Sequence, residues 1–266
     1  MKLRDRLYRL RERLLQKKTR YDSLVQFADP CKESGNDAVS ILFLEHAGQP
    51  VTKWLHYLGV YDRYFSRYRG KPVRLLEIGV MHGGSLELWR KYLGPQAKIF
   101  GVDIDPKITS LPDVTIRIGS QTDAAFLRSV TAEMGGLDIV IDDGSHVASH
   151  QRASFEILFP LLSNGGLYIV EDLHTAYWPG EWEGGYRRRG TFIEEIKSLI
   201  DDIHFWHHQK QQRFQGTHLN VAAVHVYESM VVVEKDEVAK PRYTTRGTAD
   251  PSLWPAKPVT LKRFHG

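Results

Sequence analysis

The sequence contains a single cysteine, Cys31, among 266 residues. One thiol excludes an internal disulfide and a cysteine-based metal cluster. The chain also lacks any run of about 18 apolar residues, so we expect no membrane-spanning helix. Its first residues are charged from Lys2 onward and contain no apolar stretch, which argues against a secretory signal. These absences predict a cytoplasmic protein in a reducing compartment.

The excess of positive charge is confined to the first residues of the chain. The net charge is +4, whereas residues 1–20 alone carry nine Lys or Arg and two acids. The remainder is therefore slightly acidic, which argues against a nucleic-acid partner. Leu3, Leu7, Leu10 and Leu14 alternate spacings of four and three, which predicts a basic amphipathic helix. We expect this helix to pack on its own domain or in a homo-oligomer, with peripheral contact to an anionic membrane as the weaker alternative.

From Val73 onward, short apolar runs alternate with helical segments. This pattern predicts an α/β fold, a doubly wound and mostly parallel sheet with helices on both faces. Residues 219–236 differ, because they indicate an antiparallel hairpin with a short connection near Glu228 and Ser229. We therefore expect a seven-stranded sheet, preceded by N-terminal helices. The five expected parallel strands are VRLLEIG, KIFGVD, VTIRIG, LDIVID and GGLYIVE.

Three regions follow from the changes in pattern. We expect a helical lead over residues 1–70, a main domain over 71–240 and an extended tail over 241–266. Within the lead, apolar side chains at helical spacing predict a core-facing helix that ends at Gly70, and we interpret its aromatics as packing residues. The residues on this face are Trp54, Leu55, Leu58, Tyr61, Phe65 and Tyr68.

A glycine-rich turn follows the first strand of the main domain. Glu77, Gly79 and Gly83 lie in or beside it, and Ser85 is placed to cap the next helix. Ligands of open parallel sheets bind beyond the C-terminal ends of the strands, where glycines allow close approach. The spacing differs from the dinucleotide motif G-x-G-x-x-G, which weakens the case for a pyrophosphate.

Two further strand ends carry groups suited to a nucleoside. Asp103 lies about 20 residues beyond the glycines, at a position where a carboxylate can accept hydrogen bonds from the hydroxyls of a ribose. Gln121 and Asp123 follow the third strand at the expected place of an adenine, although Asp123 is equally suited to cap a helix. This order of groups, with a terminal hairpin, resembles class I S-adenosylmethionine-dependent methyltransferases. The resemblance implies S-adenosylmethionine as methyl donor.

Paired carboxylates end the fourth and fifth strands, at Asp142–Asp143 and Glu171–Asp172. One helix links these strands, so their ends are expected to be neighbours and the four carboxylates to converge. Like charges at short range raise one another's pKa values, and a hard divalent cation such as Mg²⁺ relieves the repulsion. The alternative is that these acids cap helices or pair with Arg152 or Arg187–Arg189.

A histidine follows the first carboxylate pair. His146 lies three residues after Asp143, where a neutral imidazole can accept the proton of a metal-bound hydroxyl. The alternative for His146 is a hydrogen-bonding or capping role, which is the role that we expect for His150.

Two motifs, IDDGSH and EDLHTAYWPG, resemble the metal-dependent sugar O-methyltransferases of macrolide biosynthesis over residues 73–235. The resemblance implies that Asp143, Glu171 and Asp172 bind Mg²⁺ or a similar cation and that His146 is the catalytic base. It moves Asp142, an equal ligand candidate on the residues alone, to the donor pocket. Tyr177 and Trp178 are then expected to stack on the sugar.

The resulting hypothesis is a metal-dependent O-methyltransferase acting on a sugar hydroxyl of a glycoside or saccharide. A catechol-like phenol is the alternative acceptor, because it would chelate the ion through two oxygens and hardly need a histidine base. A non-catalytic protein that docks through its basic arm is a third possibility, which predicts steep salt dependence of binding.

Overall fold

The computed structural model describes residues 35–106, 110–208, 217, 219–244 and 246. The basic helix predicted for residues 1–20, and with it the predicted oligomer or membrane contact, lies outside these residues. Most of the predicted tail also lies outside them. Within the described part of the chain, no helix has the length and apolar character needed to cross a bilayer.

The centre of the molecule is a seven-stranded sheet in the order β3-β2-β1-β4-β5-β7-β6. Strands β1 to β5 are parallel, and β7 runs antiparallel to both β5 and β6. Tyr227 pairs with Met230, so only Glu228 and Ser229 connect the edge hairpin. The predicted sheet and hairpin are confirmed. The strands are β1 (Arg74–Ile78), β2 (Lys98–Asp103), β3 (Thr115–Ile118), β4 (Leu137–Asp142), β5 (Leu162–Val170), β6 (Val221–Tyr227) and β7 (Met230–Lys235).

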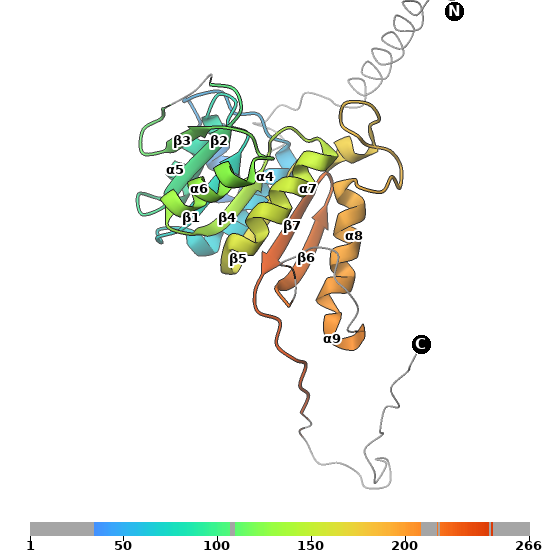
Figure 1. Cartoon of the computed structure of the whole chain (residues 1–266). Coiled ribbons are helices and arrows are strands. Elements are labelled where there is room, and N and C mark those ends of the chain that lie inside the picture. Colours follow the sequence, from blue (N-terminus) through green and yellow to red (C-terminus); the bar gives the residue numbers. More distant parts are fainter. Residues whose placement is uncertain (1–34, 107–109, 209–216, 218, 245, 247–266) are drawn as a thin grey trace, which may run out of the picture.

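Helices cover both faces of this sheet. One face carries α3 (Ala38–Leu44), α4 (Leu55–Phe65) and α5 (Gly84–Leu93). The other carries α6 (Ala124–Met134), α7 (Ala148–Leu158) and α8 (Phe192–Ile203). In Figure 1, α7 crosses in front of the sheet, α8 lies beside β6, and α4 lies behind the sheet. The remaining short elements are α9 (Phe205–His208) and the 3₁₀ turns η1 (Ser66–Tyr68), η2 (Phe159–Leu161) and η3 (Leu173–Tyr177).

Two hydrophobic cores explain why the central strands are apolar throughout. Successive side chains of a strand point to opposite faces, so a strand covered on both sides needs apolar residues at every position. Leu75 of β1 joins the core that contains Trp89 of α5. Leu76 joins the other core, with Phe155 of α7.

Helix α4 packs into the core on this face of the sheet, beside α5, as predicted for a core-facing helix. Tyr61 and Phe65 place their rings 4.6 and 5.2 Å from the ring of Trp89. The buried face differs in detail from the prediction, because Leu55 is only half-buried whereas Tyr57 is fully buried. The predicted domain boundary at residue 70 stays a prediction.

The turn into α5 differs from the prediction for Ser85. Helix α5 begins after Gly83, whose φ of 86° is in the left-handed region, and no side chain caps it. Ser85 lies in the first turn of the helix and hydrogen-bonds Glu77, so its predicted capping role is wrong. Asp123 is the residue that caps a helix, since its Oδ1 accepts from the amides of Ala125 and Phe126 at the start of α6.

Candidate active site

Asp103, at the end of β2, holds the glycine turn in place. Its Oδ2 accepts hydrogen bonds from the amides of Val80 and Met81, at 2.8 and 2.9 Å, and its Oδ1 accepts from the amide of Asp105. Because β2 and β1 are neighbours, the acid predicted for the ribose and the glycine turn do lie side by side. Its contact with a ribose stays a prediction.

Gly79 connects β1 to this turn and lies against the backbone of Asp143, at the end of β4. Its φ is 91°, and a Cβ there would lie 2.0 Å from the backbone oxygen of Asp143. A side chain would therefore push β1 and β4 apart, which makes glycine a requirement of the chain itself at this position. Gly83 begins α5. The donor-site assignments of Glu77, Gly79, Gly83 and Ser85 stay predictions.

The side chains of Asp142 and Asp143 lie in different surroundings. Asp142 is 1% exposed, and its carboxylate accepts hydrogen bonds from Ser154 and Tyr168. Asp143 is only partly buried, and its carboxylate faces Lys53 and His146. The expected convergence of four carboxylates is therefore wrong for Asp142, because side chains of consecutive residues leave a strand on opposite sides.

Gln121 is the partner of Asp142 on the neighbouring loop. Its Nε2 donates to Asp142 Oδ1 at 3.2 Å, and its Oε1 accepts from the amide of Ser145 at 2.9 Å. The pair thereby fixes the turn that carries His146. Burial raises the pKa of Asp142 to about 6. Placement of Gln121 and Asp142 in the donor pocket stays a prediction.

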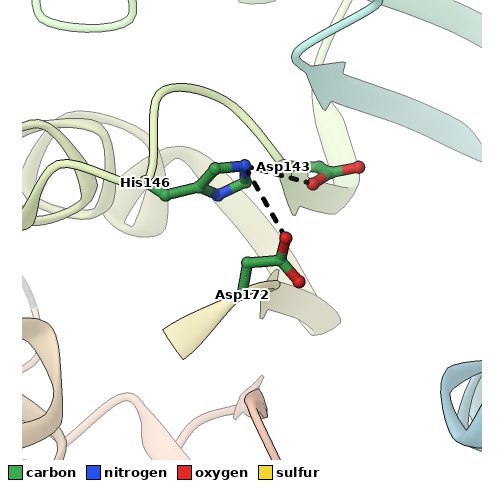
Figure 2. A group of neighbouring side chains, drawn as sticks. All are labelled: Asp143, His146 and Asp172. Carbon is green, nitrogen blue, oxygen red and sulfur yellow. Dashed lines mark ion pairs between the residues drawn. The ribbon is translucent and has the colours of Figure 1, made fainter. Parts of the chain in front are cut away.

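His146, Asp143 and Asp172 form a cluster at the carboxyl ends of β4 and β5. His146 Nε2 lies 3.8 Å from Asp143 Oδ1 and 3.9 Å from Asp172 Oδ2. Figure 2 shows the imidazole edge pointing between the two carboxylates. One ligand atom from each residue lies within 4.8 Å of the others, an arrangement that could hold a metal ion.

The backbone of this cluster is strained at two positions. His146 has a φ of 56° and Asp172 a φ of 54°, in the region that L-residues rarely adopt. Each such residue costs on the order of 1–3 kcal/mol and persists only where its surroundings hold it. The hydroxyl of Thr175 donates to the backbone oxygen of His146 at 2.9 Å, and the amide of Asp172 donates to the hydroxyl of Tyr57 at 3.2 Å.

Lys53 lies beneath this cluster and was missed in the sequence. Its side chain is 2% exposed, and its Nζ lies 2.5 Å from Asp143 Oδ2 and 2.6 Å from Glu171 Oε1. A third carboxylate, Glu77 of β1, is 3.8 Å away. Of the arginines offered as alternative partners, Arg152 pairs with Glu156 on α7, and Arg188 donates to the backbone oxygen of Gly184.

One lysine does not neutralise these acids. Burial raises the pKa of Glu171 to about 8, with the charge of Asp143 adding to the effect, and burial raises the pKa of Glu77 to about 7 against the pull of Lys53. Burial alone would lower the pKa of Lys53, but Asp143, Glu171 and Glu77 together raise it well above its ordinary value. The site therefore favours additional positive charge.

Three aromatic donors complete the surroundings of the acids. Trp54 Nε1 and the hydroxyl of Tyr57 lie 3.1 and 3.0 Å from Asp172 Oδ1, and the hydroxyl of Tyr61 donates to Glu171. Lys53, Tyr57 and Tyr61 repeat at a spacing of four. Tyr57 and Tyr61 therefore share one side of α4, and Lys53 lies two residues before that helix; the repeat of four was the available signal.

The residues predicted to contact the sugar lie at the end of η3, the turn that follows Asp172. Tyr177 ends η3 and is 48% exposed. Trp178 makes an edge contact with His174, at 4.7 Å between ring centroids, and another with Trp182, at 5.1 Å. His174 in turn lies 5.7 Å from Trp54, so a row of rings leads away from the cluster. Stacking of Tyr177 and Trp178 on a sugar stays a prediction.

The donor set suits a divalent cation. Asp143 and Asp172 each have one oxygen held by a protein donor and the other directed toward His146. Hard cations such as Mg²⁺ prefer oxygen ligands, whereas a neutral imidazole also serves as a base. Glu171 is bonded by Lys53 and Tyr61, so its predicted role as a third ligand stays a prediction.

The strand order, with β7 inserted antiparallel beside β5, defines the class I methyltransferase fold. A solved structure of the methyltransferase MycE from the mycinamycin pathway, in complex with Mg, SAH and mycinamycin VI, matches with a TM-score of 0.69 and 34% identity. The match covers 83% of this chain and 58% of that one. The Rhamnosyl O-methyltransferase/CmcI family model matches residues 44–213, and the chain belongs to this family.

Two curated relatives give the family context. The 8-demethyl-8-(2-methoxy-alpha-L-rhamnosyl)-tetracenomycin-C 3'-O-methyltransferase of Streptomyces olivaceus is 43% identical over 208 residues, which is 73% of this chain and 53% of the relative. The mycinamicin VI 2''-O-methyltransferase of Micromonospora griseorubida is 42% identical over 207 residues, 70% of this chain and 50% of the relative. The chain thus spans about half the length of these relatives.

Proposed function

We propose that the protein is an S-adenosylmethionine-dependent, divalent-metal-dependent O-methyltransferase that acts on a sugar hydroxyl of a glycoside. The observation that carries the proposal is the cluster of His146 with Asp143 and Asp172, beside the glycine turn, in a chain of this family. One relative is a 3'-O-methyltransferase of a rhamnosyl tetracenomycin, and another is a 2''-O-methyltransferase of mycinamicin VI. We further propose a cytoplasmic location, consistent with the scarcity of cysteine.

The donor site lies where β1, β2 and β4 end. Asp103 is fixed by three backbone amides, and its Oδ1 keeps one lone pair that could accept a hydrogen bond from a ribose hydroxyl. Glu77 would border the donor from the end of β1, and its Oε1 lies 3.8 Å from Lys53 Nζ. Gln121 and Asp142 would act on this site through the turn that they hold.

Asp143 and Asp172 would hold the cation, with Glu171 beside them. A bound Mg²⁺ would lower the pKa of the acceptor hydroxyl and stabilise the negative charge on its oxygen. His146 accepts the hydroxyl proton at Nε2, the atom that points into the cluster. The acceptor oxygen then bonds the methyl carbon as the carbon–sulfur bond breaks and its electron pair stays on sulfur. The residues contribute mainly by orienting the two substrates.

The acceptor class follows from the aromatic side of the cluster. Tyr177 is half-exposed and Trp178 borders the ring row, and such rings pack against the apolar face of a sugar. A deoxysugar presents a larger apolar face than a fully hydroxylated one. We therefore propose a deoxysugar glycoside, such as a rhamnoside, as the acceptor.

The test uses the full chain with S-adenosylmethionine, Mg²⁺ and rhamnosylated polyketides that lack the methyl group, scored by mass spectrometry. His146→Ala is expected to lose at least about 10²-fold in turnover, because proton transfer by a positioned group contributes roughly that factor. Asp143→Ala is expected to lose turnover because it removes a proposed ligand of the cation. Donor binding by calorimetry should stay close to that of the wild type. His204→Ala, at the exposed end of α8, is the control.

Two outcomes would contradict parts of the proposal. Full turnover of the wild type in EDTA would exclude the metal requirement. Methylation of catechols but of no glycoside in the panel would replace the sugar acceptor with the phenolic alternative.

A further inference from the structure

Segment 53–61, which precedes the parallel sheet in the sequence, supplies hydrogen-bond donors to the acids of the cluster. Lys53 holds Asp143, and Tyr61 holds Glu171. Asp172 is held most completely, by Trp54 and Tyr57 together. These partners lie more than 100 residues from Asp172 in the sequence, at separations of 118 and 115 residues.

Trp54 and Tyr57 both contact the same oxygen of Asp172, Oδ1. Their donors lie 3.1 and 3.0 Å from Asp172 Oδ1, which leaves Oδ2 directed at His146. The hydroxyl of Tyr57 also accepts from the amide of Asp172, and it lies 2.9 Å from the backbone oxygen of Ser229 in the hairpin turn. One hydroxyl therefore contacts the side chain and the strained backbone of a proposed metal ligand.

We propose that Trp54 and Tyr57 are positioning residues that fix Asp172 in its metal-binding orientation, so that segment 53–57 is part of the metal centre. This inference rests on the proposed function, because it assigns Asp172 to a divalent cation. Outer partners that orient a ligating carboxylate typically contribute a factor of 10–100 in metal affinity. Both donors are neutral, so removing them takes away orientation without changing the net charge of the site.

A matched control lies on the same helix. Tyr64 is buried on α4, and its hydroxyl lies 2.9 Å from the hydroxyl of Tyr227 on β6. Tyr57→Phe and Tyr64→Phe therefore each remove one hydroxyl that links α4 to the edge hairpin. Of these two hydroxyls, the Tyr57 hydroxyl alone contacts Asp172.

The experiment measures Mg²⁺ binding to the full chain by calorimetry and Mn²⁺ binding by electron paramagnetic resonance. We expect Tyr57→Phe and Trp54→Phe each to weaken binding by about tenfold or more, whereas Tyr64→Phe should bind within twofold of the wild type. Donor affinity should be unchanged in all three variants. The Mg²⁺ concentration for half-maximal turnover should rise in parallel, and saturating Mg²⁺ should restore most of kcat.

The possible failures are distinguishable. Absence of Mg²⁺ and Mn²⁺ binding by the wild type contradicts the metal part of the proposed function. Metal binding by the wild type with an equal affinity in Tyr57→Phe and Trp54→Phe overturns this inference alone. An equal loss in Tyr64→Phe overturns it as well, because the effect would then come from the link between α4 and the hairpin. Trp54→Phe decides the matter should Tyr57→Phe not fold.

Discussion

At the scale of single residues, Lys53 is the cation that pairs with three buried or partly buried carboxylates at once. Among the described residues, it is the one cation that lies within 4 Å of all three of Glu77, Asp143 and Glu171. Each of these acids lies at the C-terminal end of a different strand. Removal of one partner from a buried charge group leaves the others unpaired, and typical losses are about 3–5 kcal/mol. The lysine therefore holds β1, β4 and β5 together at the site.

We predict that Lys53→Met lowers the free energy of unfolding in urea by about 3–5 kcal/mol. The matched control is Lys197→Met, because Lys197 is 53% exposed and pairs with Glu194 on the surface of α8. Such exposed pairs contribute about 1 kcal/mol or less. A loss for Lys53→Met no larger than that of the control would show that the buried acids do not need this cation.

Asp142 gives a prediction with a defined pH dependence. Burial raises its pKa from 3.8 in the unfolded chain to about 6 in the folded protein. The folded state therefore binds a proton that the unfolded state has lost, so this residue's stabilising contribution is complete below pH 3.8 and declines as the pH rises to about 6.

Asp142→Asn removes that titration while keeping the size of the side chain. We expect the stability of the variant relative to the wild type to rise between pH 4 and pH 7, by roughly 2–3 kcal/mol. Urea unfolding at several pH values in EDTA measures it. A difference that stays flat with pH would mean that Asp142 titrates at its ordinary value in the folded protein.

At the scale of elements, the parallel strands were predictable and the role of α4 was not. Strands buried on both faces are continuous apolar runs, and the sequence shows such runs for β1, β2, β4 and β5. The polar contacts of α4 and of Lys53, which lies two residues before this helix, are made with partners far away in the sequence. Lys53 meets Asp143 and Glu171 across 90 and 118 residues, and no local pattern encodes a contact of that kind.

The turn after β4 shows the same limit at shorter range. Asp143 and His146 were predicted to approach each other, and their side chains do lie 3.8 Å apart. The opposite direction of Asp142 follows from strand alternation, which could have been applied to the sequence. The left-handed backbone of His146 and Asp172 could not, since it depends on bonds from Thr175 and Tyr57.

At the scale of the whole molecule, strand order brings the site together. The chain builds β1, β2 and β3 in one direction and then returns to place β4 on the other side of β1. The ends of β1 and β4 lie at this reversal, where open α/β sheets bind their ligands. The glycine turn of β1 and the carboxylates of β4 and β5 therefore share one edge, and α4 closes it from behind the sheet (Figure 1).

This arrangement predicts that the catalytic fold does not begin at residue 71. Tyr57, Leu58, Tyr61 and Phe65 are fully buried in the core of the sheet. Burial of four such side chains contributes roughly 6–12 kcal/mol, which is comparable to the roughly 5–15 kcal/mol of net stability of a typical protein. Loss of Lys53 with the same segment would also leave Glu77, Asp143 and Glu171 without their buried cation.

We therefore expect the chain from residue 71 to 266 to show no cooperative unfolding transition by circular dichroism or calorimetry. The comparison is the chain from residue 35, the first that the structure describes, which keeps every contact made by α4. That form should unfold cooperatively and gain stability from Mg²⁺ and the methyl donor, since ligands of the native state stabilise it. Cooperative unfolding of both forms at the same midpoint would make the helical lead a separate unit, as its position in the sequence suggests.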